Sequence, residues 1–194
     1  MTENNDAMRV TTGRVRLSFP YLFHPRKPAE GQDGDPKYSV MLLIPKSDTK
    51  TVEAIRAAEA LAIEAGKNTK FGGKTTGLAP SIIKDGDADG TAEDYPERAG
   101  HIYMTISAQE KFKPQVVDHN LNIITDESAV FSGVYARVSI TAFPYKYGEV
   151  KKGVSFGLNN VQILGGNESL AGGRPASADF DVAEPITMED ADLL

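Results

Sequence analysis

The segment of residues 134–143 alternates strictly between apolar residues and residues with polar or aromatic side chains. Its even-numbered positions hold small or branched apolar residues, namely Val134, Ala136, Val138, Ile140 and Ala142. Successive side chains of a β-strand point to opposite faces of a sheet, so this pattern predicts a strand with one face in the core. Such a strand needs a second layer over its apolar face.

Other segments also show strand patterns. Residues 14–19 place Val15, Leu17 and Phe19 on one face, and Pro20 is expected to end this strand. The alternation of residues 101–107 turns Tyr103 outward. Further strands are predicted at 38–44, which is apolar on both faces and therefore central, and at 81–84, 115–118, 121–124 and 154–164.

A single helix is predicted, over residues 49–65. Its apolar positions share one side: Val52, Ile55, Ala58 and Ala62. Residues 45–48 break the preceding strand and offer an N-cap, and Gly66 is expected to cap the C-terminus. Five to seven strands with one helix favour a mainly β protein, either a small barrel or an α+β sheet. Strands and helices do not alternate, which argues against a doubly wound parallel sheet.

Charge is distributed unevenly over the 194 residues. The chain has a net charge of −6, but residues 179–194 hold six acidic residues and no basic one, so the rest is neutral. Residues 9–84 hold 13 basic and 7 acidic residues, and this excess permits a basic surface. The chain has no cysteine, which excludes a disulfide scaffold, a cysteine-ligated zinc site and a thiol nucleophile.

Aromatic and basic side chains coincide on the second face of the 134–143 strand. Tyr135, Arg137 and Phe143 lie there, where a solvated strand usually carries Ser, Thr, Lys or Glu. Single-stranded nucleic acid needs rings for its bases and cations for its phosphates. The predicted nucleic-acid-binding residues are Arg14, Arg16, Tyr103, Tyr135, Arg137, Phe143, Tyr145, Lys146, Tyr147, Lys151 and Lys152. The alternative is a second apolar face covered by the helix or by a partner subunit.

The C-terminal region combines acids with apolar residues. We predict a disordered leader at residues 1–8, a nucleic-acid-binding domain at residues 9–165 and a flexible Gly-rich linker with an acidic tail at residues 166–194. Acids interspersed with apolar residues suit a basic, apolar groove on a partner protein. The predicted partner-binding residues are Asp179, Phe180, Asp181, Glu184, Glu189, Asp190, Asp192, Leu193 and Leu194.

The acidic loop at residues 85–90 matches the first half of a calcium-binding loop. Pro96 stands at the twelfth position, where a bidentate glutamate belongs, so we expect no metal site. The three histidines lack metal-ligand spacing and no serine-nucleophile motif is present, so we expect no cofactor and no catalytic residue. A metal-dependent nuclease that uses Asp85, Asp87 and Asp89 stays open as an alternative, as does a phage protein-interaction module.

Several segments stand out when the chain is read in order. They are Ser18-Phe19-Pro20-Tyr21-Leu22-Phe23-His24-Pro25, Lys37-Tyr38-Ser39-Val40, Leu43-Ile44-Pro45-Lys46-Ser47-Asp48-Thr49, Phe131-Ser132-Gly133-Val134-Tyr135-Ala136-Arg137-Val138, Gly157-Leu158-Asn159-Asn160-Val161-Gln162 and Gly172-Gly173-Arg174. Together they resemble a family of tailed-phage single-stranded DNA-binding proteins, from about Arg14 to the acidic end.

The resemblance implies an OB fold, which is a five-stranded Greek-key barrel, here with loop insertions. It implies binding of single-stranded DNA without sequence preference, in phage DNA replication or recombination, in the cytoplasm of the infected bacterium and without a membrane. It also implies that the acidic tail recruits replication or recombination proteins. Many tails of this functional class end in an aromatic residue, whereas this chain ends Asp192-Leu193-Leu194.

Overall fold

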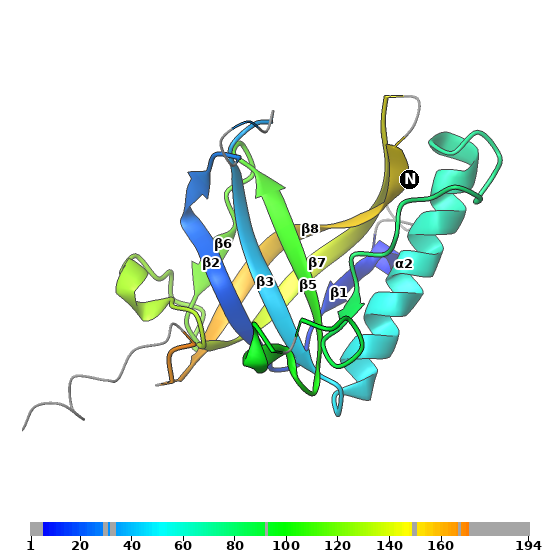
Figure 1. Ribbon diagram of the computed structural model, residues 1–194. Coiled ribbons are helices and arrows are strands. Elements are labelled where there is room, and N and C mark those ends of the chain that lie inside the picture. The colour runs from blue at the N-terminus through cyan, green and yellow to red at the C-terminus, as the bar shows by residue number, and fades with distance from the viewer. Residues whose placement is uncertain are drawn as a thin grey trace, which may run out of the picture.

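Five strands form a closed barrel in the computed structural model, which describes residues 6–28, 31, 34–91, 93–148, 151–166 and 168–170 (Figure 1). The barrel strands are β2 (Val15–Arg26), β3 (Lys37–Pro45), β5 (His101–Gln109), β7 (Tyr135–Tyr147) and β8 (Lys151–Gly165). Four neighbouring pairs, β2–β3, β3–β5, β7–β8 and β2–β7, are antiparallel, and β5 pairs with β8 in parallel. This closed order confirms the predicted OB-like barrel.

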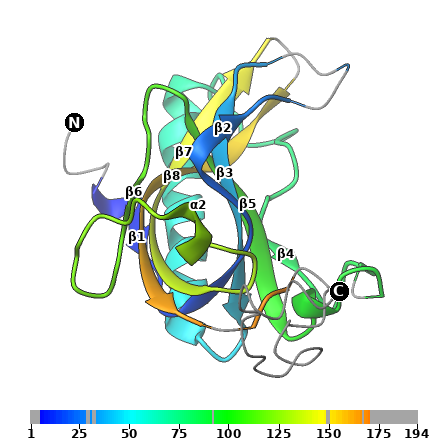
Figure 2. The ribbon, with the colours of Figure 1, turned by 90° about the vertical axis from the view of Figure 1, so that its left-hand side faces the viewer.

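Smaller elements extend the barrel. They are β1 (Arg9–Thr11), β4 (Lys84–Asp85), β6 (Gln115–Val117) and the short 3₁₀ helices η1 (Pro96–Arg98) and η2 (Glu127–Ala129). β1 adds to β7 and β6 adds to β8, so both lie beside the barrel (Figure 2). The long helix α2 (Thr49–Thr69) connects β3 to the β4–β5 region and packs against β7, β1 and β8.

The alternation of β7 is confirmed. The apolar side chains Ala136, Val138, Ile140 and Ala142 are buried in the barrel, and the odd-numbered side chains between them are half-buried or exposed. The predicted central strand, β3, is hydrogen-bonded on both sides, to β2 and to β5. One large core cluster fills the barrel and the space under α2, where Ile55, Ala58 and Ala62 are buried.

The prediction for β2 is correct in its first half and wrong after Leu17. Phe19 has a φ of 48° and is exposed, while Ser18 is buried instead. The positive φ and the register shift between Ser18 and Tyr21 show a bulge, which reverses the alternation at this point. Pro20 does not end the strand, because such a bulge tolerates a residue without a backbone N–H.

Helix α2 begins as predicted and ends later than predicted. Asp48 caps it by accepting a hydrogen bond from the backbone N–H of Thr51 at 3.1 Å. Gly66 lies inside the helix and not at its C-cap, and it is buried. A side chain at this position would collide with the ring of Phe71 and with Pro144, so the glycine permits close packing of α2 on β7.

The predicted leader is partly ordered. Met8 is buried in the core, and its carbonyl accepts a hydrogen bond from the backbone N–H of Ala142 at 3.0 Å. The predicted partner-binding residues of the tail, 179–194, lie outside the described residues. Within the described residues, no helix is long and apolar enough to cross a membrane.

Candidate nucleic-acid interface

The eleven predicted binding residues lie in three separate places. Tyr135, Arg137, Arg14 and Arg16 surround the start of β7, and Tyr103 lies on β5. The remaining residues belong to the β7–β8 hairpin. Tyr135 and Phe143 are separated by eight residues of one strand, or about 26 Å.

At the start of β7, the cations mainly contact other parts of this chain. The guanidinium carbons of Arg14 and Arg16 each lie 5.5 Å from the centre of the Tyr135 ring. Arg16 donates hydrogen bonds to the Gly133 carbonyl at 2.9 Å and to the Glu168 carbonyl at 3.0 Å, and its guanidinium lies 3.3 Å from the Glu168 carboxylate. This cluster joins the β1–β2 turn, the start of β7 and the segment after β8.

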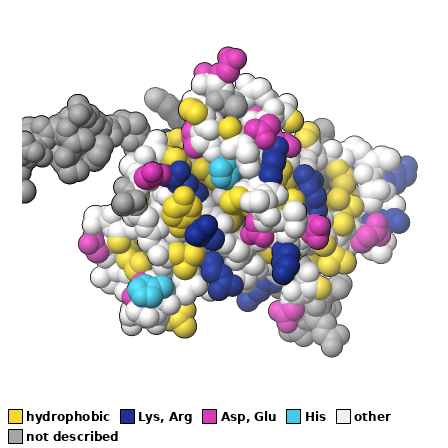
Figure 3. All heavy atoms as spheres, turned by 90° about the horizontal axis from the view of Figure 1, so that it is seen from below, with side chains coloured by type: hydrophobic (Ala, Val, Ile, Leu, Met, Phe, Trp, Pro, Cys, Tyr) yellow, Lys and Arg dark blue, Asp and Glu magenta, His cyan; other side chains and the backbone are white. Residues whose placement is uncertain are grey.

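Figure 3 shows the end of the barrel that lies at the bottom of Figure 1. Lysine and arginine side chains gather on this surface, with acidic side chains among them. Lys46 directly follows β3, and its ammonium lies 2.5 Å from the Asp85 carboxylate and 2.6 Å from the Asp87 carboxylate. Positive charge at this end is therefore partly neutralised within the molecule.

The prediction that Tyr103 offers a stacking plane is not supported, because its side chain is covered. The residue is only 5% exposed. Its hydroxyl donates a hydrogen bond to Asp89, and the Arg98 guanidinium lies 4.5 Å from the ring centre, with the Lys84 ammonium 5.9 Å away. The loop between β4 and β5 covers the ring, and it leaves no face for a base.

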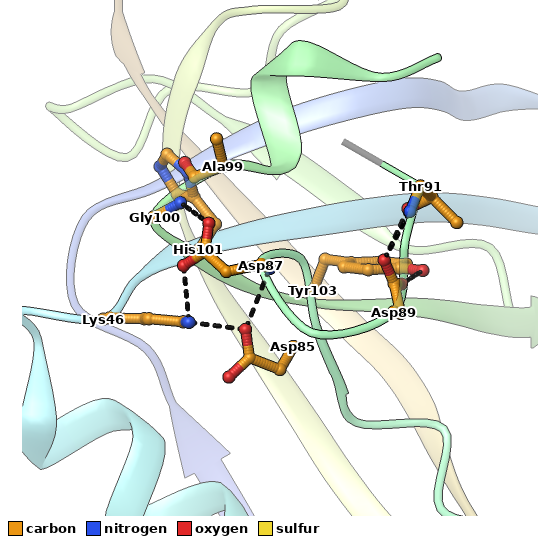
Figure 4. A network of polar contacts seen from close by, with 9 residues as sticks. All are labelled: Lys46, Asp85, Asp87, Asp89, Thr91, Ala99, Gly100, His101 and Tyr103. Carbon is orange, nitrogen blue, oxygen red and sulfur yellow. Dashed lines mark hydrogen bonds and ion pairs between the residues drawn. The ribbon is translucent and has the colours of Figure 1, made fainter. Parts of the chain in front are cut away.

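The acidic loop itself is a network of polar contacts (Figure 4). The Lys46 ammonium lowers the pKa of both Asp85 and Asp87, and these carboxylates raise the pKa of Lys46 in return. The Tyr103 hydroxyl, with smaller help from Thr91, lowers the pKa of Asp89 to about 2. The carboxylates of Asp85, Asp87 and Asp89, which the nuclease alternative would use, thus each have a partner in Lys46 or Tyr103. No group of three residues that could hold a metal ion occurs in the described part of the chain.

The β7–β8 hairpin presents open rings. Phe143 is 42% exposed and Tyr147 is 81% exposed, and both lie on the outer face of β7. Tyr147 is the cross-strand partner of Lys151, so a ring and a cation share this face. Tyr145 is half-buried, and its ring lies close over Gly153.

The two lysines that begin β8 point to opposite faces. Lys152 pairs in register with Lys146, so these two side chains share the face opposite to Tyr147 and Lys151. The Lys152 ammonium donates to the backbone carbonyls of Phe71 at 3.3 Å and Lys74 at 3.5 Å. Lys152 therefore fastens the segment after α2, and the prediction of a phosphate contact there is not supported.

A row of small residues crosses the outside of the barrel next to Phe143. Ser39 of β3 pairs with Ser107 of β5, and Ser107 pairs with Gly157 of β8. A Cβ at Gly157 would lie 3.7 Å from the Phe143 ring, so this ring borders the row on one side. Neighbouring strands lie about 4.8 Å apart, which makes the row a shallow floor roughly 10 Å across.

The opposite border of this floor carries a second ring and cation. Tyr21 of β2 pairs in register with Ser39, and the Arg26 guanidinium lies 4.9 Å from the centre of the Tyr21 ring. The row and its two borders make up a surface that we name the outer band. Its members are Tyr21, Arg26, Ser39, Ser107, Phe143, Tyr147, Lys151 and Gly157.

Further exposed residues flank the outer band near the end of β5. Lys37 pairs with both Arg26 and Gln109, and Phe112 follows three residues later on the β5–β6 connection. Phe112 is 63% exposed, with the Lys111 ammonium 5.0 Å from its ring centre. Sequence reasoning missed Tyr21, Arg26 and Phe112, although the run of lysine, phenylalanine and lysine at 111–113 shows the same aromatic and basic pattern as the hairpin.

A family model and a protein of another phage both match most of this chain. The model of the family described as "Enterobacter phage Enc34, ssDNA-binding protein" matches residues 8–194. Protein p50 of Acyrthosiphon pisum secondary endosymbiont phage 1 is 35% identical over 181 residues, which cover 90% of this chain and 93% of that protein.

Two solved structures share the fold. The single-stranded DNA-binding protein of bacteriophage Enc34, solved in complex with single-stranded DNA, is 24% identical with a TM-score of 0.68 and covers 84% of this chain and 89% of that chain. The single-stranded DNA-binding protein gp2.5 of bacteriophage T7 is 18% identical with a TM-score of 0.57, over 84% of this chain and 94% of that chain.

Proposed function

This chain belongs to the family of phage single-stranded DNA-binding proteins represented by that of Enterobacter phage Enc34, and we propose that it binds single-stranded DNA on the outer band. We infer that it binds without sequence preference and without catalysing a reaction, in phage DNA replication or recombination within the host cytoplasm. The observation that carries this proposal is the floor of small residues between two borders, each with an aromatic ring and a cation.

The outer band suits unpaired bases. Every base has a π-face, so the rings of Tyr21, Phe143 and Tyr147 can stack on any sequence, and each stack contributes about 1–3 kcal/mol. Small side chains at Ser39, Ser107 and Gly157 leave room for a flat base against the sheet. In OB folds generally, oligonucleotides bind to the face of the second and third barrel strands, which here are β3 and β5.

Cations around the outer band suit the phosphate backbone. Arg26, Lys37, Lys111 and Lys151 are exposed around its borders. Neutralising phosphates releases condensed counterions, so the affinity for DNA should fall as salt rises. Arg14 and Arg137 are exposed at the far end of β7, where they could contact DNA that extends beyond the outer band.

The acidic tail serves two roles in this proposal. Its interspersed apolar residues recruit replication or recombination proteins, and its carboxylates compete with DNA for the cations of the body. Deleting residues 179–194 should then tighten DNA binding at low salt. An unchanged or weaker affinity would contradict the competition.

A salt titration tests the proposed function. Binding to one oligonucleotide sequence is measured as single-stranded DNA, as duplex DNA and as RNA, with Mg²⁺ added in a parallel series. We expect preferential binding to single-stranded DNA, a steep loss of affinity with salt, and intact strands. Binding to none of the three would favour a protein-interaction module, and cleaved fragments would favour the nuclease.

A further inference from the structure

An apolar hollow of about 360 Å³ lies beside the outer band, between β2 and β6. Its walls include Leu22, Phe23, Pro114, Val116 and Ile124. Ile123 also lines it and is 69% exposed, so it forms part of the rim. An open hollow with an exposed aliphatic rim is suited to an apolar side chain from another segment. Figure 2 shows β6 and η2 on this side of the barrel.

The hollow and the outer band share two boundary elements. On β2, Tyr21 belongs to the outer band, while the next residues, Leu22 and Phe23, line the hollow. On the β5–β6 connection, Phe112 flanks the outer band, while Lys113 lines the hollow. A segment that fills the hollow would therefore lie within reach of cations that border the outer band.

The described chain ends within reach of this hollow. The backbone N–H of Leu170 donates a hydrogen bond to the Ser132 carbonyl at 2.7 Å. Ser132 is five residues from Glu127, which lines the hollow, and five residues span at most about 18 Å. Phe180 follows Leu170 by ten residues, which can span up to about 33 Å when extended. The first apolar residues of the acidic tail can therefore reach the hollow of their own chain.

The tail also has the matching chemistry. Phe180 and Val182 alternate with Asp179 and Asp181, so an extended segment would turn its apolar side chains one way and its carboxylates the other. Lys113 offers a cation at the hollow, and the acid on its lining, Glu127, is hydrogen-bonded to His24 at 2.7 Å. The apolar lining and the Lys113 ammonium thus suit the apolar residues and the carboxylates of this segment.

We propose that the hollow between β2 and β6 is the docking site for the segment around Phe180 and Val182 of the chain's own tail. Docking there would hold the tail carboxylates against Lys113 and the neighbouring Lys111, at the edge of the outer band. The inference rests on the proposed function in one respect, since it names the site from which the tail competes with DNA. The docking itself needs no DNA and is tested without it.

A single spin label tests the docking. Because the chain has no cysteine, Ala183→Cys in the full chain gives one attachment site for a nitroxide next to the proposed segment. We expect paramagnetic broadening of the amide signals of Val116, Ile124 and Thr125, which line the hollow. Broadening centred on Ser39, Ser107 and Gly157 would place the tail in the outer band, and no selective broadening would show that it does not dock. Either result would overturn the proposal.

A matched variant separates apolar docking from charge. Phe180→Ser with Val182→Ser keeps every carboxylate of the tail and all of the folded body. In the labelled protein this change should abolish the broadening at the hollow. Broadening that persists in this variant would contradict the docking. The affinity of the variant for single-stranded DNA at low salt should rise to that of the protein that lacks residues 179–194, whereas an unchanged affinity would contradict the claim that the tail competes with DNA from the hollow.

Discussion

Strand β7 carries an aromatic ring and cationic neighbours at both of its ends, on the same outer face of the barrel. At its start, Tyr135 lies under two arginines, and one of these is bonded to Gly133 and Glu168. At its other end, Phe143 and Tyr147 are exposed on a hairpin with Lys151. Similar residue types therefore hold chain segments together at one end and stay open to a ligand at the other.

The difference comes from what the rest of the chain places over each end. The segment after β8 returns across the start of β7, and its Glu168 supplies the carboxylate for Arg16. Beside Phe143, by contrast, the neighbouring strands contribute Ser107 and Gly157, which leave space above the sheet. A ring next to a cation becomes a candidate binding site only where tertiary structure leaves that ring uncovered.

The strongest test of this comparison removes the open rings. Phe143→Ala combined with Tyr147→Ala should lower the affinity for single-stranded DNA at least about thirtyfold, because two stacks together contribute about 2 kcal/mol or more. The affinity is measured by fluorescence anisotropy with a labelled oligothymidine. Tyr135→Ala is the matched control and should change it less than about threefold; an equal loss from both would remove the distinction between the two ends.

The converse test is stability. Tyr135→Ala removes the ring under Arg14 and Arg16, and two cation–π contacts contribute about 0.5–1 kcal/mol each. We expect its free energy of unfolding in urea to fall by about 1–2 kcal/mol. The double variant of the hairpin should lose less, since its rings are exposed. A larger loss in the hairpin would mean that its rings are structural.

Phe112 extends the comparison to a residue outside β7. Phe112→Ser removes one exposed ring beside the outer band, so we expect the DNA affinity to fall about fivefold, which corresponds to a stack of about 1 kcal/mol. Leu121→Ser removes an exposed apolar side chain elsewhere and serves as the control. No loss of affinity in the Phe112 variant would limit the interface to the outer band itself.

Two adjacent lysines give a finer test. Lys151 shares the face of Tyr147, whereas Lys152 donates to the carbonyls of Phe71 and Lys74. Lys151→Gln should reduce the salt dependence of binding to single-stranded DNA by about 0.7 in log–log slope, the value for one phosphate contact. Lys152→Gln should leave the slope unchanged and lower stability, and a reversed pattern would show that the faces are assigned wrongly.

The smallest effect concerns Tyr103, whose hydroxyl is bonded to Asp89. This contact lowers the pKa of Asp89 to about 2 in the folded protein. The stabilisation is therefore present above the unfolded pKa of about 4 and is lost as the pH falls towards 2. Tyr103→Phe should lose less stability than the wild type between pH 5 and pH 2.5 in thermal unfolding, while its DNA affinity stays unchanged.

Much of the fold follows from local patterns. The alternation of β7, the central position of β3 and the apolar side of α2 depend on side chains that alternate or repeat along one element, and all three are confirmed. The bulge at Phe19 reverses the face of β2, and it depends on one positive φ that no residue pattern announces. Gly66 shows a similar limit, because close packing and not helix capping requires the glycine there.

The candidate site was harder to predict than the fold. Phe143, Tyr147 and Lys151 follow from the pattern of one hairpin, whereas Tyr21 and Ser39 meet them only through the register of five strands. The covering of Tyr103 depends on Arg98 and Asp89, which lie in the connection between β4 and β5, where no hydrophobic periodicity is present. Contacts between distant segments thus decide which of the predicted rings are accessible.

The most direct measurement is a titration of the full chain with oligothymidine, followed residue by residue through the amide signals in NMR. We expect the largest changes at Ser39, Ser107 and Gly157, in the floor of the outer band, and little change at the amides around Tyr135. Changes centred on Tyr135 and Arg137, with the outer band unaffected, would contradict DNA binding on the outer band.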